Sequence, residues 1–176
     1  MRILLLLTLF FSFMATRDTP AQTLTTSSDD MTVSMQTYSF RLKPGVDLKA
    51  EIDELVKQRR IEAGVILTCV GSLTDVTLRL ANQDGPSNWQ GHFEVVSLVG
   101  TLSINGSHLH VSVSDSTGRT IGGHLLEGCK IYTTAEIVLG VMPDLRYVRE
   151  PDPTFGYREL VVRKKKRSLS TTKATR

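Results

Sequence analysis

Three of the four histidines in this 176-residue chain lie close together, between residues 106 and 124. His108 and His110 are separated by one residue, and His124 follows a Gly-Gly pair. Residues two apart on a β-strand point to the same side, so His108 and His110 would face together. His124 would lie directly opposite His110 if the intervening turn has an odd number of residues centred on Thr117. An even turn would point His124 to the other face.

Three imidazoles on one patch of a hairpin form a common zinc site, with a fourth position open for water or a ligand. Zinc can lower the pKa of a bound water to about 7, so hydrolysis is conceivable at such a site. The alternative is that these strand histidines are solvated or hydrogen-bonded to neighbouring residues. The residues alone leave both alternatives open. His92 lies on a different segment and is given no ligand role.

Other residues could complete a site around the histidines. Glu94, in an apolar strand run, could orient a ligating imidazole, and Ser97 on the same strand could line the same pocket. Gly122 and Gly123 have no side chains and would leave space beside the histidines. Arg119, in the turn, could hold an anionic ligand, although a solvated turn arginine is the alternative.

The elements that would position these residues follow from hydrophobic periodicity. One helix is expected from Asp47 to about Ala63, because Leu48, Ile52 and Val56 recur on one helical face and Asp47 can cap the N-terminus. Strand-like runs separated by turn residues fill most of the remaining sequence, without strand-helix-strand alternation. We therefore predict an α+β fold, with an antiparallel, curled or partly barrelled sheet and one main helix.

Charge is distributed unevenly along the chain. Residues 163–176 hold seven Lys or Arg and no acid, which leaves 14 basic against 18 acidic residues elsewhere, a balance of −4. A mildly acidic folded surface gives little support for nucleic-acid binding. We expect 163–176 to be a disordered tail. Its basic run could contact acidic polysaccharide or act as a nuclear localisation signal, the alternative being a solvated tail. The run comprises Arg163, Lys164, Lys165, Lys166 and Arg167.

The N-terminal residues have the pattern of a secretory signal peptide, an apolar run from Ile3 to Ala15 with no acid before Asp18. The run is short for a membrane span, which needs about 20 residues, so membrane association has little support. We predict a signal peptide over residues 1–21, a flexible leader over 22–34 and a folded domain over 35–162, in a secreted protein. The alternatives are an uncleaved anchor and a wrongly assigned start codon.

A secretory route would change the meaning of two further features. Cys69 and Cys129 could form a disulfide in an oxidising compartment, and the alternative is two buried free thiols. Asn105 begins the triplet Asn-Gly-Ser, a glycosylation acceptor that is equally a common turn sequence.

The chain contains, in this order, RLKPGVDL, GSLTDVTLRL, GHFEVVSLVGTLS, HLHVSVSDSTGRTIGGHLLEG and TTAEIVLG. Together these segments resemble the PPC domain, the plant and prokaryote conserved domain, over about residues 38–162. The resemblance implies a compact α+β domain that assembles as a homotrimer. It is closest to the stand-alone prokaryotic-type branch, whose three histidines match His108, His110 and His124 and are associated with a divalent metal, most plausibly zinc.

Plant members of the family carry an AT-hook and bind AT-rich DNA, and no Arg-Gly-Arg-Pro core occurs in this sequence. Their Gly-Arg-Phe-Glu-Ile-Leu motif, which contacts transcription factors, corresponds to Gly91–Val96 with His92 replacing the arginine. The leading hypothesis is a secreted homotrimer that holds a metal through the three histidines and binds a small or anionic ligand. The alternatives are a metal-dependent hydrolase with Glu94 as its base, and a nuclear DNA-associated regulator.

Overall fold

The computed structural model describes residues 33–154 and 156–165. The predicted signal peptide over 1–21 lies outside the described residues, as do residues 22–32 of the predicted leader and the tail from Lys166 onward, with Arg167. In the described part of the chain, no helix is long and apolar enough to cross a membrane.

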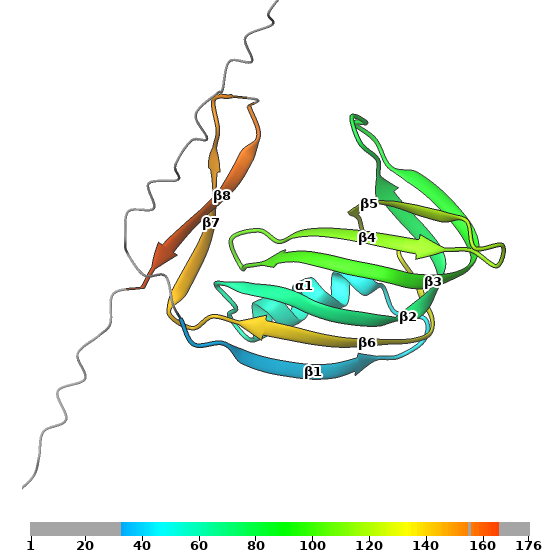
Figure 1. Cartoon of the computed structure of the whole chain (residues 1–176), viewed down its shortest axis with the longest axis horizontal. Helices are drawn as coiled ribbons and strands as arrows, with labels where there is room; N and C mark the ends of the chain where they lie inside the picture. Colours follow the sequence, from blue (N-terminus) through cyan, green and yellow to red (C-terminus); the bar gives the residue numbers. More distant parts are fainter. Residues whose placement is uncertain (1–32, 155, 166–176) are drawn as a thin grey trace, which may run out of the picture. The chain divides into compact units, whose positions relative to one another are not determined.

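Eight strands and one helix make up the part of the chain that the structure describes (Figure 1). Six strands form one antiparallel sheet in the order β1-β6-β2-β3-β4-β5, and an additional pairing of β2 with β5 partly closes it. This confirms the predicted α+β class with a curled, partly closed sheet, although β6 lies between β1 and β2 rather than in hairpin order. The strands are β1 (Gln36–Leu42), β2 (Gly64–Arg79), β3 (Ser87–Leu102), β4 (His108–Ser114), β5 (Thr120–Leu125), β6 (Ile131–Val141), β7 (Leu145–Pro151) and β8 (Arg158–Lys164).

Helix α1 (Leu48–Gln58) begins where its cap was predicted. Asp47 Oδ1 accepts a hydrogen bond from Ala50 N at 2.8 Å, and Oδ2 accepts one from Gly128 N at 2.6 Å. The same carboxylate therefore caps the helix and holds the loop before β6. The prediction that the helix continues to Ala63 is wrong, because Arg60 adopts a left-handed backbone with φ of 51° and ends the helical path.

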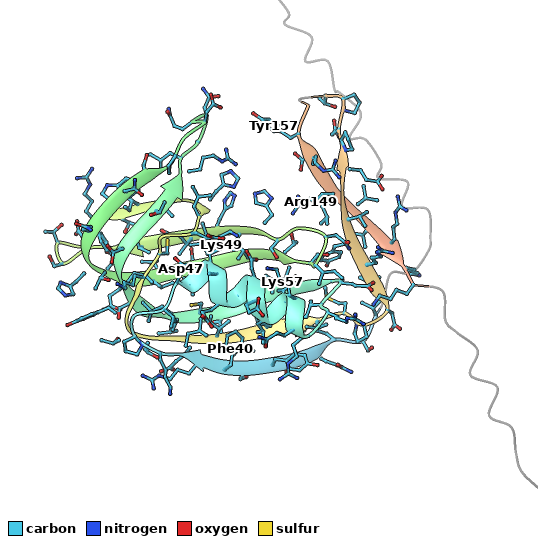
Figure 2. The ribbon with its side chains drawn as sticks, turned by 180° about the vertical axis from the view of Figure 1, so that it is seen from behind. Phe40, Asp47, Lys49, Lys57, Arg149 and Tyr157 are labelled. Carbon is cyan, nitrogen blue, oxygen red and sulfur yellow. The ribbon has the colours of Figure 1, made fainter. Side chains whose placement is uncertain are left out.

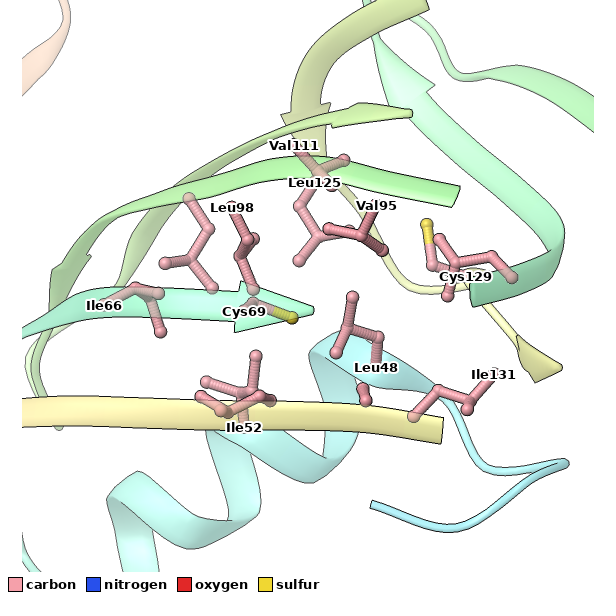
Figure 3. Packing of buried hydrophobic residues seen from close by; sticks show 14 of the residues in the cluster. Leu48, Ile52, Ile66, Cys69, Val95, Leu98, Val111, Leu125, Cys129 and Ile131 are labelled. Carbon is pink, nitrogen blue, oxygen red and sulfur yellow. The ribbon is translucent and has the colours of Figure 1, made fainter. Parts of the chain in front are cut away.

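The core lies between helix α1 and one face of the sheet (Figure 3). Leu48 and Ile52 of the helix belong to the same buried cluster as Cys69, Leu98 and Val111 from three different strands. Burying one such aliphatic side chain stabilises the fold by about 1.5–3 kcal/mol. Since successive strand residues face opposite ways, every strand that buries one set of side chains turns the other set outward.

Cys69 and Cys129 are both free thiols within this core (Figure 3). The disulfide alternative is therefore not realised in the structure, and the alternative of two buried free thiols is. Burial raises the pKa of each thiol to about 11. The Cys129 Sγ also approaches Thr77 O at 3.4 Å.

We expect neither thiol to react with a maleimide reagent in the native protein. At pH 8 a thiol with a pKa near 11 is ionised in about one molecule in a thousand, and only the thiolate is a good nucleophile. Mass spectrometry after a short pulse of reagent should show no label under native conditions and two labels in denaturant. Failure to label either thiol in denaturant without reductant would instead reveal a disulfide.

The strands β7 and β8 form a hairpin that is fastened to the sheet at its base. Tyr147 N donates to Glu62 O at 2.8 Å, and Tyr147 O accepts from Ser103 Oγ at 3.0 Å. Figure 2 shows Arg149 and Tyr157 on this hairpin, on the side that faces the start of the helix, where Lys49 lies. The hairpin therefore forms one wall beside the sheet.

The expectation that residues 163–176 form a disordered tail is wrong for the first three of them. Arg163 pairs in register with Arg146 on β7 and forms an ion pair with Glu150. The ammonium of Lys165 lies 3.1 Å from the carboxylate of Glu62. The charged residues continue the strand because backbone pairing with β7, rather than burial of side chains, holds them in place.

Candidate metal centre

The β4–β5 hairpin sets the direction of the three histidines. On β4, Leu109 and Val111 are buried in the core, so His108 and His110 face away from it. The turn has five residues between Ser114 and Thr120, which pair with each other, and His110 pairs with His124. This is the odd register that the sequence analysis required for the three histidines to share one face.

The side chain of Asp115 stabilises the turn between β4 and β5. Asp115 Oδ1 accepts hydrogen bonds from Thr117 N at 2.8 Å, Thr117 Oγ1 at 2.6 Å and Arg119 N at 3.1 Å. The hydrogen bonds from Thr117 hold the pKa of this carboxyl below its usual value. Gly118 takes a φ of 82°, which a glycine adopts without strain. These local bonds fix the odd turn and hence the register.

Three ring nitrogens meet at one point on this face. His108 Nε2, His110 Nε2 and His124 Nδ1 lie 3.1 Å from one another in every pairing. Nitrogen ligands at 2.0–2.1 Å from a tetrahedral zinc ion lie about 3.3–3.4 Å apart, close to this triangle. A cation would satisfy all three lone pairs at once, whereas three N–H groups aimed at one point would repel. The donor set therefore fits a metal ion.

Electrostatics favour the neutral, metal-binding form of two of these rings. Desolvation by burial, followed by the nearby Arg79 guanidinium, lowers the pKa of His124 to about 4. Desolvation and then the Arg149 guanidinium also lower the pKa of His108, against a smaller opposing effect of Glu159. Both rings are thus unprotonated at neutral pH, the state in which imidazole is a ligand.

The predicted role of Gly122 and Gly123, to leave space beside the histidines, is wrong for Gly123. A Cβ on Gly123 would lie 2.7 Å from Arg79 O, and one on Gly122 would lie 3.0 Å from Val111 O. Backbone atoms occupy the space that a side chain would need. At Gly123 this lets β2 approach β5 and pair Arg79 with His124. Gly123 therefore closes the sheet rather than opening a site.

Glu94, Ser97 and Arg119 do not reach the histidines. Glu94 pairs with Ser114, four residues along β4 from His110, or about 13 Å at the usual rise per residue. After a register shift between Val95 and Ser97, Ser97 pairs with Ser112, which lies two residues along β4 from His110. Arg119 lies in the exposed turn, and four paired positions of the hairpin separate this turn from the His110–His124 pair. The positions of Glu94 and Arg119 therefore do not support the roles of orienting a ligand and holding an anion, and Ser97, which was expected to line a pocket, is not among the residues that line the one beside the histidines.

An open pocket of about 690 Å³ borders the histidines and lies between the sheet and the β7–β8 hairpin. His108 and His124 contribute to its wall, together with Arg79 and Arg149. No signal in the sequence pointed to either arginine, because one enters the site through the β2–β5 pairing and the other through the hairpin. The remaining lining residues are Lys49, Asn105, Gly106, Ser107, Leu109, Leu125, Leu126, Tyr157, Arg158 and Glu159.

Asn105, the predicted glycosylation acceptor, is half-buried on the wall of this pocket. Its Nδ2 donates a hydrogen bond to Tyr147 O at 2.8 Å, and its backbone N donates to Ser103 Oγ at 3.0 Å. The folded chain therefore uses the nitrogen that a glycan would need. Glycosylation at Asn105 stays a prediction that conflicts with this hydrogen bond.

Sequence comparison relates the chain to part of much longer proteins. It is 50% identical over 127 residues to the bifunctional protein GlmU of a Synechococcus strain. That alignment covers 72% of this chain and 20% of the relative, so the chain spans about a fifth of the length of the curated protein that it matches.

Solved structures with the same fold come from bacteria and archaea. A hypothetical protein from Salmonella cholerae-suis is 41% identical with a TM-score of 0.74, covering 76% of this chain and 96% of that one. A protein from Archaeoglobus fulgidus, described as metal-containing, shares the fold at 22% identity with a TM-score of 0.64, covering 74% of this chain and 95% of that one.

The family itself is established by a match over most of the described fold. The sequence profile of the Plants and Prokaryotes Conserved (PCC) domain, the family also written PPC, matches residues 30–143. The match includes the sheet from β1 to β6, the helix and all three histidines, and ends before the β7–β8 hairpin. This chain is a member of the plant and prokaryote conserved domain family.

Proposed function

We propose that this protein binds a divalent metal ion, zinc in the first place, through His108, His110 and His124. The observation that carries the proposal is the triangle of three ring nitrogens, each 3.1 Å from the other two. Imidazole is a favoured ligand of zinc, and the Archaeoglobus protein with this fold is described as metal-containing. Bound zinc would supply a Lewis-acid position at which a small or anionic ligand binds.

The proposal includes a homotrimer, for which the outer face of the sheet offers a suitable surface. Leu67 and Val70 of β2 and Val96 and Val99 of β3 are 46%, 61%, 59% and 54% exposed. Large apolar side chains gathered on one exposed face commonly mark an interaction surface. Val99 pairs with His110, so this apolar surface borders the metal centre.

The proposal also includes secretion, which rests on the N-terminal sequence pattern. In an extracellular setting the basic run from Arg163 to Arg167 would contact acidic polysaccharide. Arg163 and Lys165 are already paired with acids of the chain, which leaves the later residues of the run as the main contact.

Metal content, measured by inductively coupled plasma mass spectrometry on size-fractionated protein, tests the metal and the trimer together. The chain should be expressed without an affinity His tag, which would itself bind metal. We expect about one zinc per chain at the elution volume of three chains. Zinc below about a tenth of an ion per chain after supplying the metal would contradict the metal site, whatever the elution volume.

We expect zinc binding to depend less steeply on pH than binding by three ordinary imidazoles. An imidazole with a pKa of about 6.5 weakens metal binding roughly 25-fold between pH 7 and pH 5, because the proton competes for the nitrogen. His124, with a pKa of about 4, remains unprotonated over this window, and the pKa of His108 is lowered as well. Competition titrations with a chromophoric chelator near pH 5 should therefore show release of about two protons per zinc or fewer, whereas three ordinary imidazoles would release nearly three. Release of nearly three protons at pH 5 would contradict these pKa shifts.

Neither alternative function gains support from the site. The hydrolase hypothesis named Glu94 as its base, and the register places that carboxylate about 13 Å along β4 from His110. The DNA-binding hypothesis rests on relatives, namely the plant members of the family and bacterial proteins of this fold for which DNA binding is proposed. In this chain the basic run begins only at the end of the hairpin.

A further inference from the structure

Two arginines lie directly beside the histidine triangle, one on each side. Arg79 pairs in register with His124 across the β2–β5 contact. Arg149 donates from Nη2 to Thr101 Oγ1 at 3.0 Å, and Thr101 is the register partner of His108. Register partners have Cβ atoms about 4.5–5.5 Å apart, so Arg79 lies directly beside His124, and the guanidinium of Arg149 is anchored on the residue beside His108.

The positive charge of this pocket is poorly compensated by the protein itself. Three guanidinium groups line it, from Arg79, Arg149 and Arg158, against a single carboxylate, Glu159. The ammonium of Lys49, also on the wall, is already paired with Asp53. Arg79 is half-buried, yet its guanidinium makes no hydrogen bond or ion pair with another residue in the part of the chain that the structure describes.

The guanidinium groups of Arg149 and Arg158 are held in place, and each keeps N–H groups that can bind a ligand. Thr101 occupies one nitrogen of Arg149 and leaves the other N–H groups available. Arg158 donates from Nη2 to the backbone oxygen of Arg149, which ties the two β7–β8 arginines together. A guanidinium presents five donors in a planar fork that matches the oxygens of a carboxylate or phosphate. Guanidinium groups with free N–H donors beside an open pocket favour the binding of an oxyanion.

We propose that Arg79 and Arg149, with Arg158, form an oxyanion subsite, and that the ligand of this protein is a small molecule bearing a carboxylate or phosphate. One end of the ligand would occupy the open position of the metal and the anionic group would lie against the arginines. In that respect the inference rests on the proposed metal site. A pocket of about 690 Å³ has the size of a typical small-molecule site.

Isothermal titration calorimetry on the zinc-loaded, untagged full chain tests this subsite at constant ionic strength. The probes form two series, inorganic phosphate with phenyl phosphate and malonate with phenylacetate, so that the tighter series identifies the anion. Arg79→Gln should weaken the tighter series by about 10-fold to 100-fold, the usual effect of losing a charge-assisted hydrogen bond. Arg149→Gln should act in the same direction.

Arg119→Gln is the matched control, because it removes the same charge from the exposed turn of the same hairpin. It should leave anion affinity unchanged, and all three variants should keep the zinc content of the wild type. Two results would overturn the subsite without affecting the metal site. In the first, the zinc-loaded wild type binds none of the probes; in the second, Arg79→Gln binds them as tightly as Arg119→Gln does. Anion binding that depends on Arg79 and is equally tight in the chain stripped of zinc would support the subsite and refute only the proposed contact between the ligand and the metal.

Discussion

Replacing His108 and His110 together by alanine is expected to lower the zinc content of the purified chain from about one ion to near zero. The change leaves one imidazole of the three whose nitrogens lie 3.1 Å apart. Zinc binding by four protein ligands releases about 10–16 kcal/mol, or a few kcal/mol per ligand, so losing two should weaken binding at least 1,000-fold. Both side chains point away from the core, so the fold should survive, and circular dichroism would verify this.

His92→Ala is the matched control for this experiment. His92 is also an exposed strand histidine, but its ring packs edge-on against Tyr132 at 4.5 Å between centroids, outside the triangle. Its removal should leave about one zinc per chain. Full zinc content in the double variant, or loss of zinc in His92→Ala, would move the metal away from the β4–β5 hairpin.

Gly100→Ala is expected to destabilise the protein by about 3 kcal/mol or more and to lower its zinc affinity at the same time. Gly100 has a φ of 145°, and a Cβ built on it would lie 2.0 Å from His108 O. Overpacking costs about 1–3 kcal/mol and a forced positive φ about 1–2 kcal/mol. The contact can be relieved only by moving β4 away from β3 at the point where His108 is held.

Thermal unfolding and chelator competition measure the two effects of this substitution. We expect the midpoint of unfolding to fall by roughly 10 °C. Gly85→Ala is the control, because Gly85 has no atom within 4 Å of the added Cβ and no positive φ. Equal stability of the two variants would show that the close approach of β3 and β4 at Gly100 is not required. Lower stability with unchanged zinc affinity would show that the metal centre tolerates a shift of β4.

Part of the arrangement of the three histidines could be predicted from the sequence because it depends on local rules. Strand periodicity places His108 and His110 together, whereas the sequence left the length of the turn open, and the five-residue turn that places His124 opposite His110 is seen only in the structure. The class of the fold followed for a similar reason, since one amphipathic helix and many alternating segments are local patterns. Motif resemblance then supplied the family, which the profile match confirms.

The arginines of the pocket could not be predicted, because their positions depend on pairings between distant segments. Arg79 reaches His124 through a contact between β2 and β5, strands that are far apart in sequence and joined only where the sheet closes. Arg149 reaches Thr101 because the β7–β8 hairpin folds back over the sheet. Sequence patterning does not record such contacts, so it pointed instead to Arg119, the arginine nearest in the chain.

The predictions of the helix terminus and of the role of Gly123 failed for a different reason, since each depends on one local backbone arrangement. Arg60 ends the helical path although its neighbours could continue it. Gly123 lacks a side chain because the backbone of Arg79 needs the space, not because a ligand does. A missing side chain is visible in the sequence, but what fills the space is visible only in the fold.

The family match ends at residue 143, whereas the wall of the pocket that carries Arg149, Arg158 and Glu159 belongs to the hairpin that follows. The histidines are thus held by the sheet, and the facing wall is carried by a separate hairpin that joins the sheet through the hydrogen bonds of Tyr147. Exchange of residues 148–164 between relatives would replace one wall of the pocket and would leave the three histidines and the buried Leu145 and Tyr147 in place. For protein engineering, this hairpin is therefore the segment to exchange when the ligand specificity is to be changed and the three histidines are to be kept.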